Sequence, residues 1–182
     1  MLKFYNSLTN KKETFTPIHR AEVKLYTCGP TVYDKAHIGN FRTFLFEDLL
    51  KRTLLAFGYK VKHIMNITDI DDKTIKKANE SNKNLSQITE HYTKLFFEDS
   101  LSLKILPADN YPLATEHIPG MIEMIKSLIN KKFAYVTEDG SVFFKISSYS
   151  KYGNLTNINM AKMKKSTRVL SDEYNLDSPQ DF

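Results

Sequence analysis

The sequence predicts an α/β fold built on a parallel β-sheet. Residues 23–28 and 59–67 alternate apolar with polar or small side chains, which is the period of β-strands. Between them, apolar residues recur at helical spacing over 41–55, and Gly58 follows where a helix end favours a residue that tolerates positive φ. The order strand, helix, strand indicates a βαβ unit, whose strands run parallel with a right-handed crossover.

The helix between the two strands is predicted to be amphipathic. Its apolar positions, which we expect to be buried, are Phe41, Phe44, Leu45, Leu49, Leu54 and Leu55. Charged residues occupy the other positions: Arg42, Glu47, Asp48, Lys51 and Arg52. This pattern places the helix on one face of the sheet.

Further elements follow the second strand. Residues 68–81 are predicted to form a loop and a short helix, and residues 86–106 a longer helix that Pro107 ends. Apolar periodicity over 118–129 predicts another helix. Two aromatic and β-branched runs then flank the pair Asp139-Gly140, which predicts a β-hairpin.

Composition limits the class of protein. The chain has 182 residues, of which 41% are hydrophobic and 26% charged, so we expect a folded globular protein. A net charge of +5 is compatible with a polyanionic partner. The single cysteine excludes an internal disulfide and favours a reducing compartment, and no apolar run reaches the ~18 residues of a membrane span. We therefore expect a cytoplasmic protein that does not associate with membranes.

The loop between the first strand and the helix is the candidate phosphate site. The carboxyl edge of a parallel sheet is where open α/β proteins bind nucleotides. The loop carries His37 and Gly39, and the helix is expected to begin at about Asn40. His37 can donate a hydrogen bond to phosphate, and free backbone N–H groups at the helix start favour an anion. The alternative is a surface histidine followed by a turn glycine.

Three stretches carry a family resemblance: "CGPTVYDKAHIGNFRTF", "NITDIDDKTIKKANE" and "TEHI". They resemble the N-terminal part of cysteinyl-tRNA synthetase, a class I aminoacyl-tRNA synthetase, and the similarity runs over the whole chain. The resemblance implies a Rossmann-like, parallel-sheet class I catalytic domain. It implies the first half of this nucleotide-binding domain in residues 1–112 and part of a connective insertion in residues 113–182.

The class I signature His-Ile-Gly-His is matched by His37, Ile38, Gly39 and Asn40, so the fourth residue departs from the pattern. The resemblance implies that His37, Gly39 and Asn40 bind ATP, which acts with Mg. It implies that the carboxylate of cysteine attacks the α-phosphate. His37 and Asn40 would be the catalytic residues, with His37 stabilising charge on phosphate oxygens.

Cys28 matches a ligand of a zinc ion that, in this family, binds the thiol of the substrate cysteine. Thiolate sulfur is a preferred zinc ligand and a serine hydroxyl is a poor one, so such a metal separates the two amino acids. Gly29, Thr31 and Thr68 match positions near the substrate. In the family the remaining zinc ligands lie outside this stretch. For a lone cysteine, the alternative is a small buried hydrophobe at a strand end.

Two charged groups have simpler explanations. Asp69, Asp71 and Asp72 are accounted for by helix capping and by pairing with Lys73. The stretch "KMKKS" at 162–166 is close to the second class I signature, Lys-Met-Ser-Lys-Ser, but it lies in a polar arm over 151–168 aligned with the connective insertion. We interpret it as a basic surface that contacts tRNA phosphates or solvent.

The resemblance implies a ligase that activates cysteine with ATP and transfers it to tRNA(Cys), and that acts as a monomer. We expect these residues to be less than half of the enzyme, and inactive alone. Two alternatives remain open. One is a tRNA-independent cysteine ligase with the same core, and the other is a noncatalytic nucleotide- or RNA-binding module.

Overall fold

The computed structural model describes residues 1–155 and 181–182, which fall into two compact units. One unit is formed by Thr16–Ile118, and the other contains Met1–Phe15 and the described residues from Pro119 onward. The basic stretch at 162–166 and most of the predicted polar arm lie outside the described residues. Within the described part, no helix is both long enough and apolar enough to cross a bilayer.

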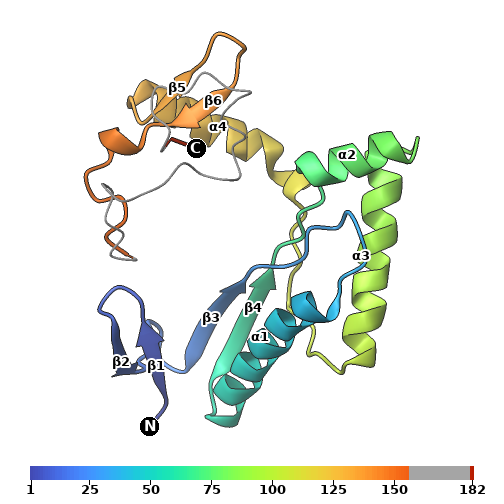
Figure 1. Cartoon of the computed structure of the whole chain (residues 1–182). Coiled ribbons are helices and arrows are strands. Elements are labelled where there is room, and N and C mark those ends of the chain that lie inside the picture. Colours follow the sequence, from blue (N-terminus) through green and yellow to red (C-terminus); the bar gives the residue numbers. More distant parts are fainter. Residues whose placement is uncertain (156–180) are drawn as a thin grey trace. The chain divides into compact units, whose positions relative to one another are not determined.

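The predicted βαβ unit is confirmed in the Thr16–Ile118 unit (Figure 1). Strand β3 (Glu22–Thr27) leads through a loop into helix α1 (Ile38–Ala56), and strand β4 (Lys60–Met65) follows. The strands pair in parallel from Glu22 opposite Lys60 to Thr27 opposite Met65. Gly58 joins α1 to β4 with φ +83°, as its position after the helix predicted.

The free edge of β4 is covered by an extended segment over residues 109–114. The N–H of Asp109 donates to the carbonyl of His63 (2.8 Å), and the N–H of Met65 donates to the carbonyl of Asn110 (3.1 Å). The N–H of Ile67 continues this pattern by donating to the carbonyl of Pro112 (2.9 Å). Strand β4 is therefore hydrogen-bonded on both sides, to β3 and to this segment, which fixes the position of its carboxyl end.

Two further helices complete this unit: α2 (Asp72–Glu80) and α3 (Leu85–Ser102). The core packs α3 against α1 and the sheet through Phe41, Phe44, Met65 and Phe96. The Phe44 and Phe96 rings meet edge to face with their centroids 5.1 Å apart, a favourable aromatic geometry.

The prediction that the longer helix reaches residue 106 is wrong. Helix α3 ends at Ser102, and Lys104 has a left-handed backbone with φ +56°. The chain thus leaves the helix before Pro107, because residues 104–107 instead form hydrogen bonds to α1. No glycine marks this helix end, so no local signal predicts it.

The other unit contains the remaining elements. They are β1 (Lys3–Asn6), β2 (Lys11–Thr14), β5 (Ala134–Val136), β6 (Val142–Phe144), the short 3-10 helix η2 (Ile146–Ser148) and most of α4 (Ile118–Asn130), which follows the 3-10 turn η1 (Ala114–His117). The predicted hairpin is confirmed: β5 and β6 are antiparallel, and Gly140 between them has φ +85°. The predicted helix over 118–129 is also confirmed. The β1–β2 hairpin was not predicted.

The predicted buried face of α1 is partly wrong. Phe41, Phe44 and Leu54 are buried, but Leu49 is 59% exposed. Leu45 and Leu55 are exposed as well, at 41% and 42%. The charged residues Asp48 and Lys51, assigned to the polar positions, are each only 8% exposed. Their burial requires partners, because an unpaired charge away from water is strongly unfavourable.

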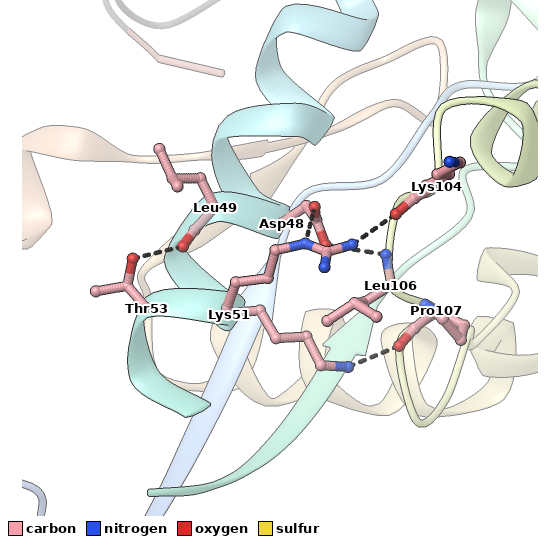
Figure 2. A network of polar contacts seen from close by, with 8 residues as sticks. Asp48, Leu49, Lys51, Thr53, Lys104, Leu106 and Pro107 are labelled. Carbon is pink, nitrogen blue, oxygen red and sulfur yellow. Dashed lines mark hydrogen bonds and ion pairs between the residues drawn. The ribbon is translucent and has the colours of Figure 1, made fainter. Parts of the chain in front are cut away.

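Those partners lie on the segment that follows α3 (Figure 2). The Asp48 carboxylate accepts hydrogen bonds from the N–H of Leu106 (2.9 Å) and from Nε of Arg52 (2.7 Å). Lys51 Nζ donates to the carbonyl of Pro107 (2.6 Å). In addition, Arg52 Nη2 donates to the carbonyl of Lys104 (2.6 Å). These contacts, which we call the α1 clamp, fasten residues 104–107 to the helix.

Replacing Asp48 by alanine should open the α1 clamp. The change leaves the N–H of Leu106 and the Arg52 guanidinium without their acceptor, so we expect a loss of about 2–3 kcal/mol in the free energy of unfolding. Urea denaturation followed by far-UV circular dichroism measures it. Glu98→Ala, which removes an exposed pair with Lys94 (3.9 Å), should change stability by less than about 0.5 kcal/mol. Equal losses in the two variants would contradict the clamp.

Candidate functional site

The segments that follow β3 and β4 continue the parallel pairing beyond the strands. The N–H of Thr68 donates to the carbonyl of Pro30 (3.0 Å), and the N–H of Val32 donates to the carbonyl of Thr68 (3.1 Å). This bridge places Thr31 opposite Thr68. The loop that enters α1 and the loop that enters α2 are thus held side by side at the carboxyl edge of the sheet.

Gly29 lies at the point of closest approach between these two loops. A Cβ built on Gly29 would lie 1.8 Å from the carbonyl oxygen of Asn66, closer than any side chain allows. Its N–H donates to Asn66 Oδ1 (3.2 Å), and Asn66 Nδ2 donates to the Thr68 hydroxyl (3.2 Å). Asn66, which sequence reasoning missed, thus joins Gly29 to Thr68, and the bridge to Thr68 brings Thr31 beside them.

Asn66 could have been found by its position. It directly follows β4, and open α/β proteins bind ligands with polar residues at the carboxyl ends of parallel strands. The Tyr26 hydroxyl also donates to Asn66 Oδ1 (3.0 Å). This amide thus accepts from two groups and donates to a third, which fixes its orientation between the loops.

Cys28 follows β3 directly and is exposed. It is therefore not the small buried hydrophobe that was the alternative explanation. Its Sγ contacts the carbonyl of Gly29 at 3.8 Å. Within the part of the chain that the structure describes, no group of three or more His, Cys, Asp or Glu side chains could hold a metal ion. These residues do not form a zinc site by themselves.

A buried polar cluster lies behind Cys28. The Thr27 hydroxyl and His63 Nε2 are 2.9 Å apart, and His63 is only 2% exposed. Its Nδ1 has no partner in the described residues, nor has Oε2 of Glu47. Burial lowers the pKa of His63, assisted by the Lys51 charge, and burial raises the pKa of Glu47. The cluster supports the strand end from which Cys28 projects.

His37 caps helix α1. Its Nδ1 accepts a hydrogen bond from the N–H of Gly39 (3.0 Å), while Asn40 Oδ1 accepts from the N–H of His37 (3.0 Å). An Nδ1 that accepts leaves the ring proton of a neutral imidazole on Nε2, so Nε2 is the atom that can donate to a ligand. This cap occupies the Gly39 N–H, so that group is not one of the free backbone N–H groups expected at the helix start.

The capped helix end opens onto a cavity of about 320 Å³. Its walls come from the loop after β3, from α1, from α2 and from α3. The lining residues are Gly29, Pro30, Thr31, Val32, Tyr33, Asp34, Lys35, Ala36, His37, Asn40, Phe44, Lys73, Tyr92 and Phe96. Polar groups thus converge on a concave surface with an aromatic base, the general character of a small-molecule site.

The three neighbouring aspartates have separate structural roles. Asp71 caps α2, since its carboxylate accepts from the N–H of Thr74 (2.9 Å), and Asp72 lies in the first turn of that helix. The capping explanation is confirmed for Asp71, whereas Asp72 lies at the positive end of the helix dipole without a capping hydrogen bond among the described residues. Asp69 instead accepts from the N–H (3.0 Å) and hydroxyl of Thr115. The expected pairing with Lys73 is not found among the described residues.

Comparison with known proteins identifies the family. A family model described as the class I (C) tRNA synthetase catalytic domain matches residues 14–182. The chain belongs to this family. The resemblance noted from the sequence and the predicted class I α/β fold are thereby confirmed.

Two curated relatives of the class I (C) family illustrate the similarity. The cysteine–tRNA ligase of Chlamydia felis (strain Fe/C-56) is 53% identical over 181 residues. The cysteine–tRNA ligase of Methanococcus maripaludis (strain C6 / ATCC BAA-1332) is 47% identical over 182 residues. Each match covers 100% of this chain and 38% of the relative. The chain therefore spans well under half the length of these proteins.

A solved structure supports the fold. This chain superposes with a TM-score of 0.56 on the LeuRS of a solved structure. That structure is the ternary complex of Agrobacterium radiobacter K84 agnB2 LeuRS-tRNA-LeuAMS. The match covers 66% of this chain and 16% of that one, at 19% sequence identity. At this identity the likeness shows a shared class I fold.

Gly29→Ala should be severely destabilising. The added methyl would overlap the backbone carbonyl of Asn66, which lies at the carboxyl edge of the sheet. We therefore expect the free energy of unfolding to fall by about 3 kcal/mol or more. Urea unfolding gives the change. Gly120→Ala is the matched control, since a Cβ there meets nothing within 4 Å and Gly120 lies within α4. The free energy of unfolding of Gly120→Ala should rise by up to about 1 kcal/mol, because alanine favours a helix more than glycine does. A Gly29→Ala variant as stable as the wild type would disprove the close approach.

His63 should make stability depend on pH. Burial lowers the pKa of this imidazole in the folded state, whereas the unfolded chain protonates it near the ordinary pKa of 6.5. The unfolded state then binds more protons, so the free energy of unfolding should fall as pH decreases below about 6.5. Urea midpoints measured from about pH 7.5 to about pH 5.5 should show this slope in the wild type and a smaller one in His63→Gln.

Glu47 acts with the opposite sign, because its raised pKa lets the folded state bind the extra proton. Both the wild type and His63→Gln contain Glu47, so its contribution cancels when the slope of stability against pH in one is subtracted from the slope in the other. His91→Gln, on the exposed surface of α3, is the control and should keep the full slope. An unchanged slope in His63→Gln would show that another group is responsible.

Proposed function

We propose that this chain provides part of the site at which cysteine is activated by ATP before its transfer to tRNA(Cys). The observation that carries the proposal is the orientation of His37. Its cap with Gly39 directs the Nε2 proton away from the helix, in a residue that lines the cavity at the sheet edge. The curated relatives at 47–53% identity, which are cysteine–tRNA ligases, supply the substrate class.

In the proposed reaction, the cysteine carboxylate attacks the α-phosphate of ATP and pyrophosphate leaves. His37 donates from Nε2 to a phosphate oxygen and stabilises the charge that develops there, without itself transferring a proton. The positive end of the α1 dipole adds to this effect. Asn40 supports it twice: its Oδ1 completes the cap, and its Nδ2 can donate to the nucleotide.

The substrate cysteine is proposed to lie over the paired loops, beside Gly29, Thr31 and Thr68. Asn66 fixes the Gly29 backbone through its N–H and donates to the Thr68 hydroxyl, whose own proton remains free to orient an amino acid without rearrangement. The absence of a side chain at Gly29 lets the two loops approach closely enough to form this surface.

Cys28 is proposed as one ligand of a zinc ion, with the other ligands outside the described residues. When bound, zinc would select a thiol over a hydroxyl through its preference for sulfur. Mg is proposed to accompany ATP. We also propose that the protein is cytoplasmic and monomeric. We propose a domain boundary between residues 112 and 113.

The test replaces the matching 38% of the Chlamydia felis ligase by this chain. The chimera should exchange labelled pyrophosphate into ATP in the presence of cysteine and not of serine, while the 182-residue chain alone should not. In the chimera, His37→Ala should lower the exchange rate by about 100-fold, because one transition-state donor is lost. The control His91→Ala should retain full activity.

A folded chimera that binds RNA but ignores cysteine and ATP would instead favour the noncatalytic module. Exchange that proceeds normally, followed by failure to charge tRNA(Cys), would favour the tRNA-independent ligase. Full exchange in His37→Ala would remove His37 from the catalytic step. Folding of each variant is checked by circular dichroism before the assay.

A further inference from the structure

Lys73 differs from the other lysines of α2 in its partners. Lys76 and Lys77 each form an ion pair with a carboxylate, at 3.9 and 3.8 Å. Among the described residues Lys73 has no carboxylate partner, and its Nζ lies 5.3 Å from the centre of the Tyr33 ring. The ring face attracts the ammonium without neutralising it. The positive charge of Lys73 therefore remains available to an anion.

The position of Lys73 in its helix is electrostatically unfavourable. Helix α2 begins at Asp72, so Lys73 lies in the first turn, at the positive end of the helix dipole. A lysine four residues later would suit the dipole better, and Lys77 is such a residue. The Asp71 cap and Asp72 already offset part of this repulsion, and a bound anion beside Lys73 would offset it further.

Lys73 lines the same cavity as His37. The other charged side chains on its walls are Lys35 and Asp34. The Asp34 carboxylate is offset by Lys77 (3.8 Å) and accepts from the N–H of Lys35 (2.8 Å). The cavity thus presents two ammonium groups and an imidazole N–H, against one carboxylate that already has partners.

We propose that Lys73 is a second cationic contact for the phosphates of the nucleotide, acting from α2 while His37 acts from α1. The inference rests on the proposed function, since it assigns a further residue to the same ATP site. An ammonium is a compact charge that neutralises phosphate without demanding a fixed geometry. The Tyr33 ring beneath it limits where that charge can lie.

The test measures binding of inorganic tripolyphosphate to the full 182-residue chain by isothermal titration calorimetry. Lys73→Met keeps an unbranched side chain and removes the charge, so the affinity should fall about fivefold to tenfold. Lys73→Arg should retain most of the affinity. Lys76→Met is the matched control, because it removes a charge from the same helix outside the cavity, and it should bind as the wild type does.

Adenosine, which has no phosphate, should bind the wild type and Lys73→Met equally. Equal losses in Lys73→Met and Lys76→Met would indicate a diffuse charge effect and overturn the proposal. So would an unchanged affinity in Lys73→Met, or no binding by the wild type. A chimera that fails in pyrophosphate exchange would reject the proposed function, and a Lys73-dependent affinity for tripolyphosphate would still identify an anion site.

Discussion

The structure of the site depends on one close contact between two backbones. Where the loops after β3 and β4 run side by side, Gly29 approaches the carbonyl of Asn66 so closely that no side chain fits between them. The bridge between Thr31 and Thr68 can form because this approach is allowed. The two loops then behave as an extension of the sheet, and its hydrogen-bond ladder supplies the rigidity that substrate-positioning groups require.

A second constraint sets the position of α1. Aromatic packing against Phe96 fixes one part of the helix, and the α1 clamp fixes another through charged groups that the helix buries. Buried charges are stable here because each has a partner on the segment after α3. That segment continues along β4, so the same stretch of chain orients both the helix and the central strand of the unit.

Local patterns were sufficient to predict the βαβ unit, α4 and the β5–β6 hairpin, since each is encoded by periodicity and turn residues within a short window. They failed where the deciding partner is distant in sequence. Asp48 was assigned to the polar side of α1 because its partner Leu106 lies 58 positions away. Asn66 was missed for the same reason, as Gly29 precedes it by 37 residues. The loop order predicted a candidate phosphate site, whereas the cap on the Gly39 N–H depends on the orientation of the His37 side chain, which no local pattern specifies.

The cap on α1 links the protonation of His37 Nδ1 to the start of the helix. While Nδ1 accepts from Gly39, it holds the first turn of the helix together and the imidazole is neutral. A proton placed on Nδ1 would create a cation for a phosphate and at the same time remove the acceptor from the helix start. A charged His37 ring and the hydrogen bond from the Gly39 N–H to Nδ1 are thus mutually exclusive. A ligand that favours the protonated ring would therefore weaken the hydrogen bond from Gly39, whereas a ligand bound through Nε2 of the neutral ring would leave it intact.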